Sequence, residues 1–318
     1  MLTMNRIKTF RIIVVAVFST FFSLFLSSCI DEVLIDRDFD ESQKLVLYCR
    51  LCPQFDTTYI LLTNTTLLYT TTHQENILPE NGVVELSADG NHWVRANFMP
   101  DNQHFYLTKQ EFPIEEGGTY FIRASYPGYE DVSSSCTVPY THDVGFRFDT
   151  VSTNNDVHLG EIYNWPHRDV YAEWRDVAGE ENYYALMEKN RFADHYYGND
   201  GDPLFTIYYW KFYTVWMYRD NQDYRYISDE GFDGKIMRFM AFENLPEEGD
   251  NHWYEDEDED SETEYYFLFL DRDCYLYEKT LNDNDFNMNF LMLEPEHTYT
   301  NIKNGFGLFG ALSMVKVK

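Results

Sequence analysis

One stretch with strictly alternating side chains limits the fold that this chain can adopt. In Thr119–Tyr126 every second residue lies on the same face of an extended backbone. That face carries Tyr120, Ile122, Ala124 and Tyr126. Pro127-Gly128 then turns the chain, so Val132–Val138 is expected to return as the paired strand. Since a strand with one apolar face must cover it with a second layer, the stretch predicts a layered β-sheet structure.

Short β-rich runs continue this pattern from Lys44 to about Pro139. Before the alternating stretch they occupy Lys44–Leu51, Thr58–Thr63, Val83–Ser87, Trp93–Ala96 and His104–Thr108. Asp89-Gly90 between two of these runs is a hairpin signal, because both residues tolerate a positive φ. Strands at near-regular spacing, without a convincing helix, favour an immunoglobulin-like β-sandwich over residues 44–139.

A larger β-rich domain with one or two short helices is expected over residues 140–318. Pro139 and the mixed polar stretch to Asp156 are typical of a domain boundary. Cys274–Leu281 is the best short helix, whereas Gly305–Gly310 lacks the context of a dinucleotide loop and indicates tightly packed strands. The aromatic-rich strand candidates are Val170–Trp174, Tyr183–Lys189, Phe205–Tyr218, Ile236–Phe242 and Tyr265–Leu270.

An acidic insert interrupts this second part near residues 247–264. Glu255–Glu264 reads EDEDEDSETE, in which like charges repel and make an ordered strand costly. We therefore interpret the insert as a solvated loop between two strands. A weak calcium-collecting loop or an acidic docking patch is the alternative, but the segment lacks the turn glycine of a calcium loop.

The first 28 residues have the layout of a bacterial lipoprotein signal peptide. Arg6, Lys8 and Arg11 precede an apolar run that ends Leu26-Ser27-Ser28-Cys29, and the run is too short to span a bilayer comfortably. This ending resembles a lipobox, in which the cysteine thiol accepts a diacylglycerol and the leader is cleaved just before it. An ordinary signal peptide with a chance cysteine is the alternative. Several acyl chains on Cys29 give stable membrane anchoring.

An acidic tether, residues 29–43, is expected to link the anchor to the folded part. Asp31 and Glu32 follow Cys29 closely, and their position resembles the signal that exports lipoproteins to the cell surface. The whole chain carries a formal net charge of −30, which excludes nucleic acid as a partner because both would be anionic. Its 25 Phe, 26 Tyr and 6 Trp argue against a disordered acidic chain.

The cysteines and histidines do not form a recognisable metal or catalytic motif. Cys49 and Cys52 have the spacing of a zinc or redox pair, but residues three apart in a strand point to opposite faces. Semi-buried structural cysteines, with or without one disulfide among Cys49, Cys52, Cys136 and Cys274, are the favoured interpretation. The sequence holds no nucleophile elbow, HExxH motif or phosphate loop, so we expect no cofactor, no metal and no enzymatic activity.

One short stretch is unusually rich in aromatic residues. It contains Tyr208, Tyr209, Trp210, Phe212, Tyr213, Trp216 and Tyr218. Such clusters are mostly core, but where they are exposed they mark binding surfaces, because flat rings offer a large contact area at low entropic cost. We take Tyr209, Trp210, Tyr213 and Trp216 as the candidate ligand-binding aromatics.

Several stretches together resemble a Bacteroidota lipoprotein family, domain of unknown function 4249. They are KLVLYCRL near the start of the sandwich, Ala172–Leu186 (AEWRDVAGEENYYAL), Ile227–Lys235 (ISDEGFDGK), Tyr275–Leu281 (YLYEKTL) and Tyr299–Leu312 (YTNIKNGFGLFGAL). The resemblance implies an outer-membrane lipoprotein, of a kind often encoded beside TonB-dependent transporters, without established catalytic residues. The Cys49/Cys52 pair and the acidic insert depart from the family pattern.

These observations predict a surface-anchored, non-enzymatic lipoprotein of the outer membrane that faces the cell exterior. It would assist a TonB-dependent transporter in nutrient uptake, by binding substrate or by capping the barrel. An adhesin or structural surface module is the second hypothesis, since immunoglobulin-like domains are common there. A hydrolase is the third, without residues that would support it. The sequence does not identify the ligand.

Overall fold

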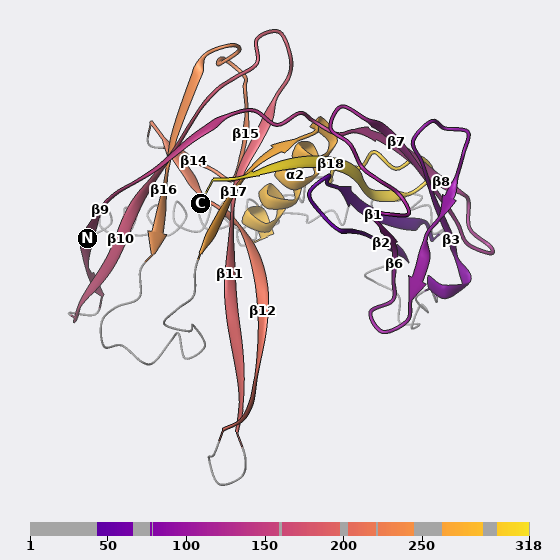
Figure 1. Ribbon diagram of the computed structural model, residues 1–318, viewed down its shortest axis with the longest axis horizontal. Helices are drawn as coiled ribbons and strands as arrows, with labels where there is room; N and C mark the ends of the chain where they lie inside the picture. The colour runs from indigo at the N-terminus through magenta and orange to yellow at the C-terminus, as the bar shows by residue number, and fades with distance from the viewer. Residues whose placement is uncertain are drawn as a thin grey trace, which may run out of the picture. The chain divides into compact units, whose positions relative to one another are not determined.

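A computed structural model of the chain describes residues 43–65, 77, 79–158, 161–197, 203–220, 222–244, 263–288 and 298–317. The leader, Cys29, Asp31, Glu32 and most of the acidic insert lie outside the described residues. In the described ranges, no helix combines the length and apolar character needed to cross a membrane. Residues 43–318 form one compact unit, shown in Figure 1.

Two sheets face each other in the N-terminal part and enclose a common core. One holds β1 (Leu45–Leu51), β2 (Thr57–Asn64), β6 (His104–Thr108) and β5 (Asn97–Met99) in that order. The other holds β4 (Val94–Arg95), β3 (Val83–Ser87), β7 (Thr119–Ser125) and β8 (Val132–Thr137), and a short 3-10 turn, η1 (Pro79–Asn81), precedes β3. Leu47, Leu62, Leu86 and Ile122 are fully buried between the two sheets.

A single strand from the end of the chain joins this sandwich to the rest of the molecule. β18 (Phe306–Lys316) runs parallel to β1 on one side and antiparallel to β17 (Glu264–Leu270) on the other. β17 continues to β11 (Tyr183–Tyr197) and β12 (Pro203–Val215), and β15 (Tyr226–Ser228) also pairs with β11. The result is one nine-stranded sheet that crosses the boundary expected at residues 139–140.

A five-stranded sheet covers the C-terminal half of the nine-stranded sheet. Its order is β14 (Gln222–Tyr224), β13 (Met217–Arg219), β16 (Ile236–Asn244), β10 (Glu161–Arg175) and β9 (Val144–His158). The core between the two sheets is aromatic: the Trp174 ring lies 4.5 Å from that of Phe267 and 5.0 Å from that of Tyr184. The second part therefore buries its aromatic residues much as the first part buries its aliphatic ones.

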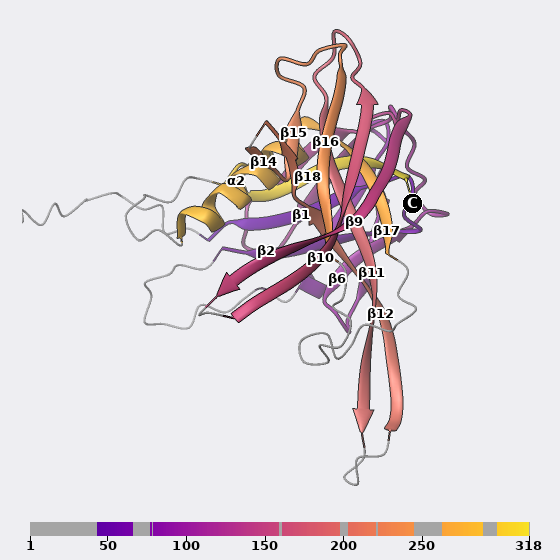
Figure 2. The same cartoon turned by 90° about the vertical axis from the view of Figure 1, so that its left-hand side faces the viewer.

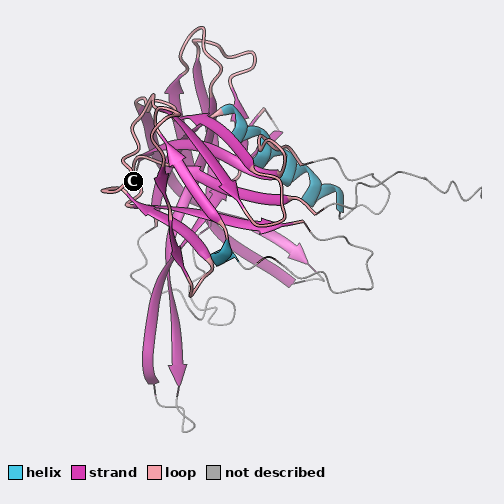
Figure 3. Cartoon of the chain, turned by 90° about the vertical axis from the view of Figure 1, so that its right-hand side faces the viewer, coloured by secondary structure: helices cyan, strands magenta, loops and turns pink. Residues whose placement is uncertain are grey.

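The helix α2 (Arg272–Met288) packs on the opposite face of the nine-stranded sheet (Figure 3). It begins after Asp271, whose carboxylate accepts the backbone N–H of Cys274 at 2.7 Å and that of Ala311 on β18 at 2.8 Å. Burial raises the pKa of Asp271 to about 7. Further along the helix, Glu278 binds Arg50 of β1 at 3.1 Å. One acidic residue at the start and one in the middle thus fix α2 to the sheet.

The mainly β class and the layered, sandwich-like arrangement are confirmed, whereas the immunoglobulin-like connectivity stays a prediction. The hairpins at Asp89-Gly90 and Pro127-Gly128 form as expected. The expected helix at Cys274–Leu281 exists and is longer, from Arg272 to Met288. Most of the polar stretch interpreted as a domain boundary forms the strand β9, because its hydrogen bonds to β10 outweigh its polar composition. The division into domains at residues 139–140 stays a prediction.

The four cysteines among the described residues, Cys49, Cys52, Cys136 and Cys274, are free and buried. Cys49 lies in the core between the sandwich sheets, whereas Cys52 lies in the cluster under α2, so the pair does not converge on one site. Burial raises the pKa of the Cys52 thiol to about 11 and that of Cys49 further. Neutral thiols are poor metal ligands and poor nucleophiles, which agrees with the structural interpretation of these residues.

Candidate functional site

The expected aromatic stretch lies mainly on β12, continues through Trp216, and ends at Tyr218 on β13. β12 is the terminal strand of the nine-stranded sheet, and β11 is its neighbour there. Tyr209 and Trp210 pair with Phe192 and Arg191 of β11, but their side chains lie outside the described part. The structure therefore locates all four candidate aromatics on or beside one sheet edge and describes the side chains of two of them, Tyr213 and Trp216.

The described aromatics at this edge are exposed. Phe212 is 50% exposed, Tyr213 42% and Trp216 38%. Phe212 and Tyr213 are consecutive strand residues and point to opposite faces, so both faces of β12 present an aromatic ring to solvent. The guanidinium of Arg225 lies 4.6 Å from the centre of the Trp216 ring. We call Phe212, Tyr213 and Trp216 the edge aromatics.

Beyond the edge aromatics, β11 and β12 continue as a two-stranded ribbon. β17 pairs with β11 only as far as Lys189, whereas β12 pairs with β11 out to Tyr197. Figures 1 and 2 show the two strands extending past the rest of the sheet. An isolated two-stranded ribbon is marginally stable in water, so contact with a partner would stabilise this part of the ribbon.

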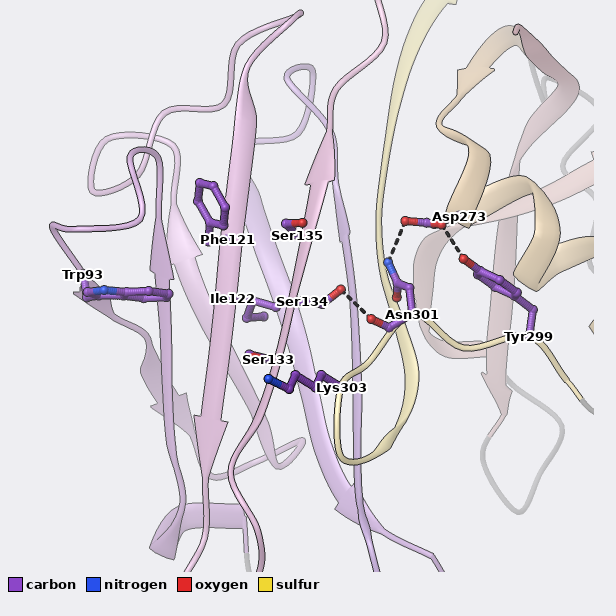
Figure 4. A pocket seen from close by; sticks show the side chains of 10 residues that line it. All are labelled: Trp93, Phe121, Ile122, Ser133, Ser134, Ser135, Asp273, Tyr299, Asn301 and Lys303. Atoms are coloured by element: carbon purple, nitrogen blue, oxygen red, sulfur yellow. Dashed lines mark hydrogen bonds between the residues drawn. The ribbon is translucent and has the colours of Figure 1, made fainter.

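A second candidate site is a groove of about 490 Å³ beside β7 and β8 of the four-stranded sheet (Figure 4). We call it the serine groove. It is lined by Trp93, Phe121, Ile122, Ser133, Ser134, Ser135, Asp273, Tyr299, Asn301 and Lys303. Figure 4 shows Trp93 and Phe121 on one side, Tyr299 and Asp273 on the other, and the serines between them.

A rigid turn positions Trp93 at the aromatic side of the groove. In the hairpin between β3 and β4, the Asp89 carboxylate accepts the backbone N–H of Asn91 at 2.8 Å and that of His92 at 2.7 Å. The His92 ring lies 2.6 Å from the same carboxylate; it holds the pKa of Asp89 well below its usual range, and Asp89 raises the pKa of His92. The guanidinium of Arg123 lies 4.2 Å from the Trp93 ring centre.

A hydrogen-bond network organises the polar side of the groove. Asp273 accepts the Tyr299 hydroxyl at 2.5 Å and the Asn301 amide at 2.9 Å. The same Asn301 side chain bonds both the N–H and the C=O of Phe309, at 3.0 and 2.8 Å, and therefore fixes the segment that precedes β18. The Ser134 hydroxyl donates to the Asn301 carbonyl at 2.9 Å, which attaches this segment to β8.

Sequence reasoning did not identify the serine groove. Its residues come from five separate parts of the chain, and the topology alone brings Trp93, the serines, Asp273 and Lys303 together. The only available signal was the YTNIKNGFGLFGAL stretch, which supplies Tyr299, Asn301 and Lys303. Among the described residues, no group of three or more His, Cys, Asp or Glu side chains is arranged to hold a metal ion.

The comparison with protein families covers both candidate sites. The model of a family described as domain of unknown function (DUF4249) matches residues 30–317, which include the edge aromatics and the serine groove. No curated protein matches the chain. Because the match extends over nearly all of the sequence, the chain belongs to the DUF4249 family.

Proposed function

We propose that this protein is a lipid-anchored, non-enzymatic accessory protein of the outer membrane that contacts a TonB-dependent transporter through the edge aromatics. The observation that carries the contact is the exposure of Phe212 and Tyr213 on the terminal strand β12 and of Trp216 directly after it. Aromatic residues and arginine are enriched in the cores of protein interfaces, where they bury a large area at low entropic cost.

The anchoring half of the proposal depends on Cys29. The lipobox ending Leu26-Ser27-Ser28-Cys29 supports lipidation, and the acidic residues Asp31 and Glu32 support transfer to the cell surface. An anchored protein searches for its partner within the membrane plane, so a modest contact area is sufficient for binding, as in other tethered pairs. Cys29→Ala is expected to release the protein from the outer membrane into the soluble fraction.

The transporter contact is tested by affinity capture from native outer membranes. The tagged chain is expected to recover a TonB-dependent transporter, and Phe212→Ala/Tyr213→Ala is expected to reduce that recovery at least tenfold, since truncated interface hot spots typically cost ~2 kcal/mol or more. Tyr59→Ala is the matched control, because Tyr59 is also an exposed strand aromatic, at 51%, but lies on β2.

Two results would contradict the proposal. Capture that returns no transporter with the unaltered chain excludes the accessory function. Recovery that is equally reduced by Tyr59→Ala shows that the loss comes from general destabilisation and not from the edge aromatics. Loss of cell adhesion on deletion of the gene, with nutrient uptake intact, would instead favour the adhesin hypothesis.

A further inference from the structure

We propose that the serine groove binds a neutral, polyhydroxylated ligand of the size of an oligosaccharide segment. The groove lies against the four-stranded sheet, whereas the edge aromatics lie on the nine-stranded sheet. The proposal therefore goes beyond the transporter contact and does not depend on it. Its support comes from the size of the groove, its chemistry and its charge.

The size and the aromatic side of the groove suit a ring-shaped ligand. The groove has a volume of about 490 Å³ and is open to solvent, so it would hold one side of a ligand segment without enclosing it. Phe121 and Trp93 line one side of the groove, and the electron-rich face of such a ring attracts positively polarised C–H groups, such as those on the apolar face of a sugar ring. The Arg123 guanidinium covers one face of the Trp93 ring, so a sugar ring would stack on the other face. Because the Asp89 turn fixes the hairpin that carries Trp93, little entropy is lost when a ligand stacks against it.

The polar side presents an acceptor that is already oriented. Tyr299 and Asn301 each donate one hydrogen bond to Asp273 and hold its carboxylate in place. A carboxylate has about four acceptor positions, so two are left for ligand hydroxyls. Pre-organised charge-assisted acceptors of this kind are roughly twice as strong as neutral ones.

Several donors beside this carboxylate have no partner within the described part of the chain. The hydroxyls of Ser133 and Ser135, the Lys303 ammonium and the Trp93 indole N–H make no hydrogen bond to another described residue. Hydroxyls that both donate and accept suit a ligand that carries many hydroxyls of its own. A purely apolar ligand would leave these groups unpaired, at a cost of 1–3 kcal/mol for each one buried.

The charge of the groove favours a neutral ligand. Among its lining residues the Asp273 carboxylate and the Lys303 ammonium balance each other. The chain as a whole carries a net charge of −30, so an anionic ligand would be repelled on approach. A cationic ligand would find many better sites on the acidic surface than this balanced groove.

The test measures binding of neutral hexasaccharides of glucose, xylose, mannose or galactose to the full-length lipoprotein in detergent, by calorimetry. At least one is expected to bind, and Trp93→Ala is expected to weaken it at least tenfold, whereas Trp93→Phe retains most of the affinity. Ser133→Ala/Ser135→Ala is expected to weaken binding several-fold. Tyr59→Ala, on a different sheet, is expected to leave it unchanged, and thermal melts confirm that each variant is folded.

Specific outcomes overturn the proposal. The first is that none of the four neutral hexasaccharides binds at millimolar concentration. The second is that Trp93→Ala leaves the affinity for the bound hexasaccharide unchanged. The third is that only an acidic hexasaccharide, such as a galacturonan fragment, binds. Because no transporter is present, failure here leaves the transporter contact intact. Failure of the transporter capture likewise leaves this groove unaffected.

Discussion

At the scale of single residues, Gly307 shows how closely the two central strands approach. Its φ is +109°, and a Cβ placed on it would lie 2.1 Å from the carbonyl oxygen of Leu47. Both the backbone conformation and the space exclude a side chain. The glycines of Gly305–Gly310 were expected to mark tight strand packing, and Gly307 confirms it at the pairing of β18 with β1.

Gly307→Ala is therefore expected to lower the free energy of unfolding by about 3 kcal/mol or more, because strain at φ and a backbone clash add together. Urea denaturation measures the loss. Gly128→Ala is the matched control: Gly128 also has a positive φ, +87°, but nothing lies within 4 Å of the added Cβ. The control is expected to cost about 1–2 kcal/mol. Equal losses in both variants would show that the approach of β18 to Leu47 is unimportant.

At the scale of elements, the side chain of Glu264 on β17 forms ion pairs with lysines on the two neighbouring strands, β11 and β18. Glu264 at the start of β17 accepts hydrogen bonds from Lys189 of β11, at 2.7 Å, and from Lys316 of β18. These bonds, first from Lys189 and then from Lys316, lower the pKa of Glu264 to about 2. Glu264 is also the last residue of the acidic insert, so the insert ends in a fixed ion-paired position.

This ion pair predicts a specific sensitivity to acid. A carboxylate whose pKa is lower in the folded state than its ordinary 4.5 stabilises the fold above pH 4.5. That contribution is lost as the pH falls from 4.5 towards 2. Glu264→Gln is expected to unfold more easily than the unaltered chain at pH 6, and the difference is expected to shrink at pH 3.

Urea titrations at the two pH values measure this difference in the free energy of unfolding. Glu130→Gln is the control, since Glu130 is exposed in the turn between β7 and β8 and makes no ion pair within the described residues. A difference between Glu264→Gln and the unaltered chain that stays constant from pH 6 to pH 3 would contradict the assignment of the low pKa to this carboxylate.

The short strands and the helix could be predicted from local patterns, but the pairing of distant elements could not. His104–Thr108 and Val83–Ser87 match the observed strands because alternation and turn signals are local. The strand β9 was not predicted because it is rich in Asn and Asp, which are rare in strands. Its pairing with β10 overrides the low strand propensity of these residues. The parallel pairing of β1 with β18 joins residues about 260 positions apart, which no periodicity encodes.

The difference between local patterns and distant pairings also explains which features of the two candidate sites could be predicted from the sequence. The edge aromatics form one continuous stretch, so their density was visible in the sequence, although their exposure was not. The serine groove has no local signature, because Trp93, Ser135, Asp273 and Lys303 are scattered over more than 200 positions. Only the strand order and the packing of α2 bring them together.

At the scale of the whole molecule, β18 makes the two halves mutually dependent. It completes the sheet beside β1 and contributes Phe309 and Ala311 to the sandwich core. It also pairs with β17, and its Leu308 and Leu312 pack in the cluster under α2. Residues 44–139, which the sequence suggests as a separate domain, therefore lack one strand and part of their core when taken alone.

The fragment 43–139 is accordingly expected not to fold by itself. Removing β18 exposes the edge of β1 and uncovers part of its buried face, which carries Leu47, Cys49 and Leu51. The free energy of unfolding of a small β-sandwich is only several kcal/mol, and exposing each core side chain lowers it by about 1.5–3 kcal/mol. We expect poorly dispersed amide NMR signals and no cooperative thermal transition, and partial recovery of both when a peptide of residues 298–317 is added. A fragment that unfolds cooperatively without the peptide would show that the sandwich is an independent domain and that β18 merely adds to it.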